Sequence, residues 1–398
     1  MQKLLSAMAV VFSIGITGSV YAQDFWKGYK AYQEKDYATA LKEWRYLAER
    51  GDTDAQQNIG VMLRDGHGVA QEYKEAVVWF RKAADQGLAD AQKNLGLMYK
   101  NGEGVVQDYK EAVSWYRKAA DQGDAYAQLF LGWMYADAKG VELDEKQAVH
   151  WYRKAAEQGN TDAQVFLGWM YLYGVVVQDY KQAIFWFRKA SEQGDSKATY
   201  TLGNMYKDGE GVVRDYKEAM VWFRKAKEQG HADAQVSMTK VLEELRSLAG
   251  KGNALAQNDL GSIFFNGNGV VQDVKEAVIW FRKAAEQGNA DAQFNLGVIY
   301  KNGEGVIQDF KESVIWYRKA AEQGRAYSQY AMALAYQYGQ GVIQDNVYSH
   351  MWWNIAASNG AHESASFRDT LAKKMTAAEI AKAQDLAREC VKKQYKGC

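Results

Sequence analysis

The chain has 398 residues, and its 49 Lys and Arg residues balance its 49 Asp and Glu residues. This length indicates several domains or a repeat array, and the formal net charge of zero excludes an overall field that would attract nucleic acid or an anionic membrane surface. The 36 Gly residues and the absence of Pro are typical of many helices that end at glycine caps, and an aromatic content of 13% excludes a disordered chain.

The first 22 residues have the pattern of a secretory signal peptide. Lys3 precedes an apolar stretch from Leu4 to Thr17, and Val20 and Ala22 supply the small residues that flank a cleavage site. We therefore expect cleavage after Ala22 and an exported chain, either periplasmic or secreted. The stretch is shorter than the roughly 20 apolar residues that cross a bilayer. An uncleaved anchor is the alternative.

A glycine recurs at a nearly constant spacing after this segment. The interval is 36 residues almost throughout, with one interval of 35 and one of 22. The glycines are Gly51, Gly87, Gly123, Gly159, Gly194, Gly230, Gly252, Gly288, Gly324 and Gly360. A fixed period of this length predicts a solenoid, in which each unit packs only against its neighbours. The spacing defines eight repeats and one truncated repeat.

Residues 87–122 serve as the type unit. Leu95 and Tyr99 lie four residues apart on one face of a first helix, helix A, and Trp115 with Tyr116 marks one face of a second, helix B. The glycine-containing segment 101–104 between them predicts a loop. Each unit is therefore a helix–loop–helix hairpin.

The ends of helix B carry capping signals. Asp108 is the expected N-cap, and Glu111 three residues later completes a capping-box pattern. Gly123 is expected to close the helix at the C′ position. In the last repeat no Glu follows Asp345 at the third position, which puts its capping box in doubt.

Two positions recur in nearly every repeat. A glycine inside helix A predicts close helix–helix approach, because glycine is otherwise unfavourable there; it is Gly60, Gly96, Gly132, Gly168, Gly203, Gly261 and Gly297, with Ala333 last. A helix-B tryptophan beside alanine predicts a core position, although a ligand-stacking ladder is the alternative. It is Trp79, Trp115, Trp151, Trp186, Trp222, Trp280, Trp316 and Trp352.

The shared motif AQ-x2-LG-x2-Y-x2-G-x-GV-x2-D-Y-K-E-A-V-x-W-[FY]-R-K-A-A-x-Q-G resembles the Sel1-like repeat family, which is related to tetratricopeptide repeats. The resemblance extends from about Gly51 to Gly360. It implies an all-α, right-handed α-solenoid that binds other proteins. Residues 51–229 would hold repeats 1–5 and residues 252–359 repeats 6–8, between a capping hairpin at 23–50 and a helical cap at 360–398.

Two irregularities interrupt the array. Residues 230–251 lack the interhelical loop, so His231 to Ala249 is expected to form one long helix between five repeats and three. This segment is either a hinge that changes the superhelix direction or a scar of duplication. In the fourth repeat, the loop from Tyr173 to Val177 has lost one residue and one glycine.

The sequence contains no recognisable catalytic, metal-binding or nucleotide-binding motif. The five histidines (His67, His150, His231, His350 and His362) have no metal-ligand spacing and are interpreted as surface or cap residues, and the Gly-x-Gly loops lack the context of a nucleotide site. We expect no catalytic residue, no metal and no cofactor. Cys390 and Cys398 form either a local disulfide, as an oxidising compartment favours, or two free thiols.

The third and fourth repeats depart from the type unit on helix A. Where other repeats have polar or small aliphatic residues, these repeats have aromatic and apolar ones, which we interpret as a partner-binding surface. The residues are Leu129, Phe130, Trp133, Phe166, Trp169 and Tyr173. Packing between helices or a dimer contact is the alternative.

These observations favour a non-enzymatic scaffold that holds a protein or a peptide segment in a repeat groove, without binding nucleic acid or remaining inserted in a membrane. Two alternatives are a secreted factor that binds host proteins and an enzyme of the penicillin-recognising type. The second draws on cysteine-rich Sel1-like proteins with a cysteine pair in each repeat, and the repeats of this chain contain no cysteine. The sequence does not determine the partner or the oligomeric state.

Overall fold

The computed structural model describes residues 17–398, which form 21 helices and no strand. The predicted all-helical repeat fold is therefore confirmed. The predicted signal peptide lies mostly outside the described residues, and its cleavage after Ala22 stays a prediction. The chain divides after Gln193 into two compact units.

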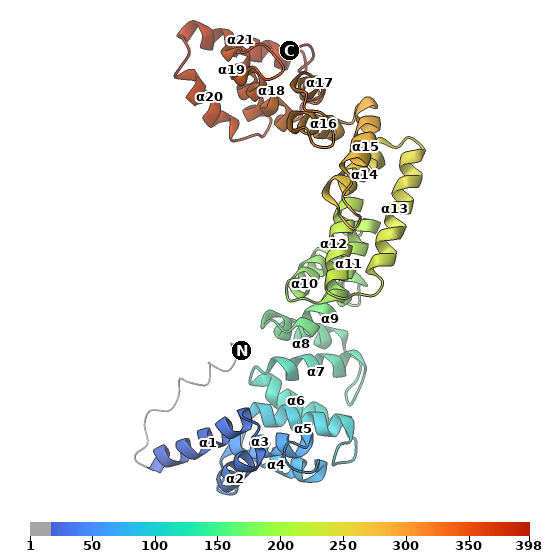
Figure 1. The fold of residues 1–398 in the computed structure, drawn as a ribbon. Helices are drawn as coiled ribbons and strands as arrows, with labels where there is room; N and C mark the ends of the chain where they lie inside the picture. The colour runs from blue at the N-terminus through green and yellow to red at the C-terminus, as the bar shows by residue number, and fades with distance from the viewer. Residues whose placement is uncertain (1–16) are drawn as a thin grey trace. The chain divides into compact units, whose positions relative to one another are not determined.

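Unit 1 is a succession of helical hairpins, each packed on the next (Figure 1). The first hairpin precedes the repeats and consists of α1 (Thr17–Gln33) and α2 (Tyr37–Ala48). Four repeats follow, with an odd-numbered helix A and an even-numbered helix B. Their helices are α3 (Thr53–Asp65), α4 (Tyr73–Asp85), α5 (Ala89–Asn101), α6 (Tyr109–Asp121), α7 (Ala125–Ala136), α8 (Glu145–Glu157), α9 (Thr161–Leu172) and α10 (Tyr180–Glu192).

Unit 2 contains the other four repeats, a single long helix and a helical C-terminal segment (Figure 1). The helices are α11 (Ser196–Asp208), α12 (Tyr216–Glu228), α13 (Ala234–Gly250), α14 (Ala254–Asn266), α15 (Val274–Glu286), α16 (Ala290–Asn302), α17 (Phe310–Ala321), α18 (Ala326–Tyr338), α19 (Asn346–Ser358), α20 (Ser364–Ala372) and α21 (Ala377–Lys392). The truncated repeat is the single helix α13, which packs against α12 and α14 through Met238, Val241 and Leu245. A change of superhelix direction there stays a prediction.

The glycine that closes helix B adopts the backbone conformation the sequence predicts. Gly123 has φ = 95° and follows the C-cap residue Gln122. Its N–H donates to the carbonyl of Ala120 at 3.0 Å, and the N–H of Asp124 donates to that of Ala119 at 3.1 Å. This pair of bonds is a Schellman motif, which satisfies two carbonyls that the helix end leaves free. The C′ assignment of Gly123 is confirmed.

The start of helix B differs from the predicted capping box. The Asp108 carboxylate accepts from the backbone N–H groups of Lys110 and Glu111 at 2.9 and 3.0 Å, so the N-cap is confirmed. Glu111 does not bond back to the cap. Its carboxylate instead accepts from the indole N–H of Trp115 at 3.0 Å, because that largely buried donor needs a partner. Asp345 caps α19 in the same way without a following Glu.

The helix-B tryptophans are core residues, as the sequence predicts, although Trp222 and Trp280 are only half-buried. In repeats 3 and 4 their indole partner is missing. Gln147 replaces the glutamate four residues before Trp151, and the buried Trp151 indole N–H has no hydrogen-bond partner. The buried indole N–H of Trp186 also has no hydrogen-bond partner. The indole N–H of Trp352 in the last repeat also has no hydrogen-bond partner, so repeats 3, 4 and 8 share this departure in their core.

The glycine inside helix A allows the aromatic ring of helix B to lie against the helix backbone. A Cβ atom at Gly132 would lie 2.7 Å from Cδ1 of Tyr152, well inside van der Waals contact. Equivalent Phe or Tyr rings lie 2.4–2.7 Å from a Cβ built at Gly60, Gly96, Gly168, Gly203, Gly261 and Gly297. The predicted close approach of the two helices is therefore confirmed.

Buried glutamine amides join each repeat to the next. The amide of Gln122 donates to the side-chain oxygen of Gln92 at 2.8 Å, and Gln92 in turn donates to the backbone carbonyl of Ala84 at 3.2 Å. The same relay recurs from Gln158 to Gln128 at 2.8 Å. The buried amides of Gln92 and Gln128 are thereby paired, and their bonds to the carbonyls of Ala84 and Ala120 in the preceding repeat hold successive repeats in register.

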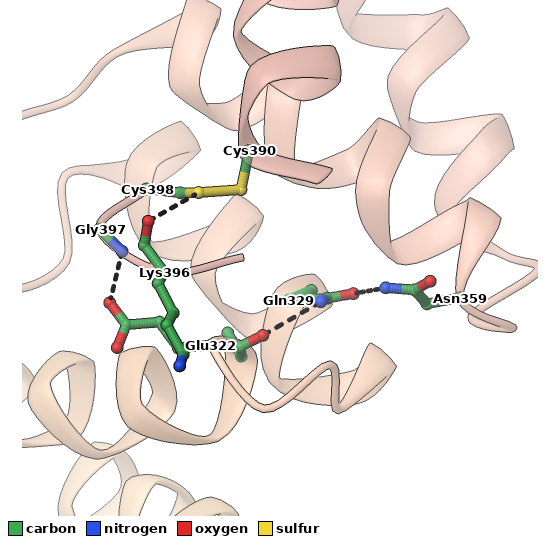
Figure 2. The surroundings of a disulfide bond; sticks show 8 residues. Glu322, Gln329, Asn359, Cys390, Lys396, Gly397 and Cys398 are labelled. Atoms are coloured by element: carbon green, nitrogen blue, oxygen red, sulfur yellow. Dashed lines mark hydrogen bonds between the residues drawn. A yellow bond between two sulfur atoms is a disulfide. The ribbon is translucent and has the colours of Figure 1, made fainter. Parts of the chain in front are cut away.

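The C-terminal segment folds back on the last two repeats (Figure 2). Cys390 on α21 forms a disulfide with Cys398. Beside it the N–H of Gly397 donates to the Glu322 carboxylate at 3.3 Å, and Tyr395 donates to the side-chain oxygen of Asn359 at 3.0 Å. The tail is therefore tied both to α21 and to the end of α17.

We expect Gly132→Ala to destabilise the protein by about 1–3 kcal/mol, because the new methyl group overlaps the buried Tyr152 ring. Gly250→Ala is the matched control, since a Cβ at this helical glycine meets nothing within 4 Å. The control should be neutral or stabilise by up to about 1 kcal/mol. Thermal and urea unfolding measure both changes. Equal stability of the two variants would contradict the role assigned to Gly132.

Candidate protein-binding site

Helices α7 and α9 bring four of the predicted surface residues to one cavity. The cavity has a volume of about 390 Å³ and opens on the helix-A side of repeats 3 and 4. Trp133 comes from α7, Phe166 and Trp169 come from α9, and Tyr173 is the C-cap of α9. The remaining lining residues are Ala136, Asp137, Glu145, Tyr152, Met170 and Val175.

The rings around this cavity support one another. Phe166 stacks on the buried Tyr152, with ring centroids 5.4 Å apart, and meets Trp169 edge-on at 6.1 Å. Phe166 nevertheless stays 36% exposed and Tyr173 74% exposed. Offset and edge-on pairs are the favourable arrangements of aromatic rings. The apolar surface is therefore held in place before any partner binds.

Phe130 and Trp133 are half-buried, whereas Phe166 of α9 is exposed. Phe130 packs against Tyr116 with ring centroids 5.2 Å apart and does not line the cavity. The ammonium of Lys100 on α5 lies over both rings, 5.2 Å from the centroid of Phe130 and 5.1 Å from that of Trp133. These two rings already have a cation–π partner within the chain.

The placement of Leu129 on the predicted surface is wrong. Leu129 is only 6% exposed and packs in the core with Tyr152 and Ala155. It stands one residue before Phe130, and one residue turns a helix by about 100°. The side chain therefore faces α8 and not the solvent. Leu129 belongs to the repeat core.

Two carboxylates at the cavity were missed by the sequence prediction. Asp137 and Glu145 are exposed, and within residues 17–398 neither makes a hydrogen bond or ion pair through its side chain. In the type unit the same positions hold the uncharged residues Asn101 and Tyr109. A comparison of the repeats could therefore have identified the two carboxylates from the sequence. Burial, with a smaller contribution from Asp137, raises the pKa of Tyr152, which stays a neutral phenol at physiological pH. The cavity is aromatic and anionic.

The shortened loop of repeat 4 extends this surface. Glu145 and Val175 also line an adjoining cavity of about 450 Å³, together with Leu143 and Val176. Leu143 is exposed, as are the loop valines at 175–177. Leu143 and the exposed loop valines thus form an apolar margin beside the aromatic cavity.

Comparison with known proteins places this geometry in a family. The Sel1 repeat family matches eight segments of the chain, at residues 53–88, 89–124, 125–160, 161–195, 196–231, 254–289, 290–324 and 326–360. The chain belongs to the Sel1 repeat family. The unmatched residues 232–253 contain α13.

Two solved structures show what the chain is similar to. A protective antigen present in uropathogenic Escherichia coli strains, which displays an SLR fold, is 34% identical over 95% of this chain and 85% of that chain, with a TM-score of 0.54. A Sel1 repeat protein from Oxalobacter formigenes is 32% identical over 66% of this chain and 99% of that chain, with a TM-score of 0.49. No curated protein matches the chain.

The Sel1 repeats of unit 2 contain a cavity at the equivalent position, with a volume of about 220 Å³. Phe265, Phe281 and Phe294 line it, and Asn266 stands where the first cavity has Asp137. No carboxylate lines this second cavity. The helix-A side of the Sel1 array thus offers pockets of similar shape and different charge.

Other candidate sites receive little support. Within residues 17–398 no three His, Cys, Asp or Glu side chains converge as metal ligands, and no helix is long and apolar enough to cross a membrane. His350 is buried in α19, the second helix of the last repeat, which corrects its interpretation as a surface or cap residue, and burial lowers its pKa. His67 stacks on Tyr37 with centroids 5.2 Å apart and bonds to the Tyr32 hydroxyl at 2.9 Å.

The two tryptophans should differ in their effect on stability. Trp133 packs against two core clusters that meet at α7, whereas Trp169 contacts mainly the cavity rings. We therefore expect Trp133→Ala to cost about 2–4 kcal/mol and Trp169→Ala about 1 kcal/mol or less. Urea unfolding monitored by circular dichroism measures both. A larger loss for Trp169→Ala would show that the Trp169 ring is structural.

Proposed function

We propose that this Sel1 repeat protein is a non-enzymatic scaffold, exported to the bacterial envelope or the secreted space, that holds a protein or a peptide segment at the aromatic cavity of repeats 3 and 4. The observation that carries the proposal is the set of exposed rings at that cavity. Phe166 and Tyr173 are exposed and Trp169 is half-buried, and at the positions of Phe166 and Trp169 the other repeats have polar, small or aliphatic residues, with Phe130 and Trp133 of repeat 3 as the exceptions.

Physical reasoning favours a protein partner. Aromatic side chains contribute a large share of the binding energy at protein interfaces, where a few well-packed residues dominate. Phe166 is already held by stacking on Tyr152 and by its edge-on contact with Trp169, so little side-chain entropy of that ring is lost on binding. The Sel1 repeat scaffold itself suggests protein–protein interaction.

Binding is tested with the double variant Trp169→Ala with Tyr173→Ser, used as bait beside the wild type in periplasmic and in host-cell extracts. A partner that uses the cavity should bind the double variant at least about 30-fold more weakly, since interface hot spots contribute about 2 kcal/mol or more. Phe185→Ala is the matched control, because Phe185 is a 47% exposed aromatic residue on helix B of the same repeat and lies away from the cavity.

Retention of all captured proteins by the double variant, with normal melting, would contradict the assignment of the cavity. Loss of the partner by the Phe185 control as well would indicate nonspecific apolar capture. A partner from host extract alone supports the secreted, host-binding form of the proposal. A partner from periplasm alone supports an envelope adaptor.

Export is supported by the N-terminal sequence pattern and by the disulfide between Cys390 and Cys398, a bond typical of oxidising compartments. We expect mass spectrometry of the exported protein to find a mature N-terminus at Gln23. Free thiol labelling after extraction should leave both cysteines unmodified until a reductant is added. An intact N-terminus in a cytoplasmic fraction would contradict the proposal of export.

A further inference from the structure

In repeat 3, the pair of aromatic rings equivalent to the pair at the cavity is covered by a lysine side chain of the same chain. In repeat 3, Phe130 and Trp133 of α7 lie beneath the ammonium of Lys100, which projects from helix A of the preceding repeat. The ammonium lies within the distance at which a cation is attracted to a ring face. One helix-A residue thus completes a site formed by two rings of the next repeat.

One repeat further on, the rings are retained and the cation is lost. Phe166 and Trp169 occupy the positions equivalent to Phe130 and Trp133, each 36 residues later. The residue 36 positions after Lys100 is Ala136, whose methyl group cannot reach over the rings. Ala136, Phe166 and Trp169 instead line the open cavity of about 390 Å³.

Negative charge has been added where the cation was lost. Asn101 and Tyr109 beside Lys100 correspond to Asp137 and Glu145 beside Ala136, and both carboxylates line the cavity. Neither has an intramolecular ion-pair partner within residues 17–398. Lys146 follows Glu145 in the chain, yet it lines the adjoining cavity and not this one. Lys139 lies over the ring of Tyr109, 5.4 Å from its centroid.

From this comparison we propose that the cavity binds the cationic side chain of a lysine or arginine from a partner polypeptide, seated over Phe166 and Trp169 as Lys100 is seated over Phe130 and Trp133. Asp137 and Glu145 take part by balancing its charge. The inference rests on the proposed function, because it names the chemistry of the partner group that the scaffold holds. The equivalent cavity of unit 2, with Asn266 in place of the aspartate and a phenylalanine at the position of Ala136, lacks both features.

The test uses the full chain and short probe peptides of the form acetyl-Gly-Ser-X-Ser-Gly-amide, with X as lysine, arginine, norleucine or glutamate. Binding is measured by ligand-observed NMR titration. The lysine and arginine probes should bind at least about fivefold more tightly than the norleucine probe, an effect of the size that cation–π contact supplies. The glutamate probe should not bind.

Ala136→Lys is the decisive variant, because the new side chain should occupy the cavity as Lys100 does one repeat earlier. It should weaken binding of the lysine probe at least about fivefold. Ala136→Ser is the matched control, which adds neither reach nor charge and should keep wild-type binding. Asp137→Asn combined with Glu145→Gln should reduce the preference for lysine over norleucine and leave only the part that the rings supply. Melting curves of all variants establish that each is folded.

Equal binding of the lysine and norleucine probes, no binding of the lysine probe, or unchanged binding to Ala136→Lys would overturn the inference. Such a result leaves the scaffold proposal standing if the partner captured in extracts is still lost in the Trp169 and Tyr173 double variant. If that variant keeps its partner while the lysine probe binds as expected, the cavity is a cation site and the proposed partner lies elsewhere.

Discussion

The contact between a helix-A glycine and a helix-B aromatic ring is the constraint on which the repeat depends. Because a Cβ atom at Gly132 would lie 2.7 Å from the Tyr152 ring, the two helices of a hairpin can pack at this distance only if that position has no side chain. The glycine costs helix stability locally, by roughly 0.5–1 kcal/mol. Burial of the apolar ring stabilises the hairpin by more than this cost. The same pair recurs in seven repeats, so each hairpin has nearly the same geometry.

Repetition of one hairpin geometry fixes where polar groups must meet between repeats. The bond from Gln92 to the Ala84 carbonyl of the preceding repeat satisfies a buried amide that would otherwise destabilise the interface. With the core and these bonds occupied by recurring contacts, the remaining helix-A positions are free to vary. Repeats 3 and 4 use that freedom for aromatic residues, and the cavity beside Asp137 is the result.

The same scaffold explains why the cavity is charged and open in one place and neutral in another. Lys100 closes the rings of repeat 3, Ala136 leaves those of repeat 4 uncovered, and Phe265 fills much of the equivalent space in unit 2. A single position of helix A thus decides whether neighbouring rings are covered by the chain or left open. Function in such an array follows from departures at a few sites on a constant framework.

The sequence by itself determined the helices, their glycine ends and the position of the truncated repeat, because periodicity and capping depend on residues close in the chain. It also predicted which repeats carry the aromatic surface. Only the tertiary structure decided that Leu129 faces the core, that Glu111 bonds to Trp115 instead of the helix cap, and that Asp137 and Glu145 meet the rings of α9. Each of these outcomes depends on the angle at which one helix meets the next, and contacts across repeats are set by that packing.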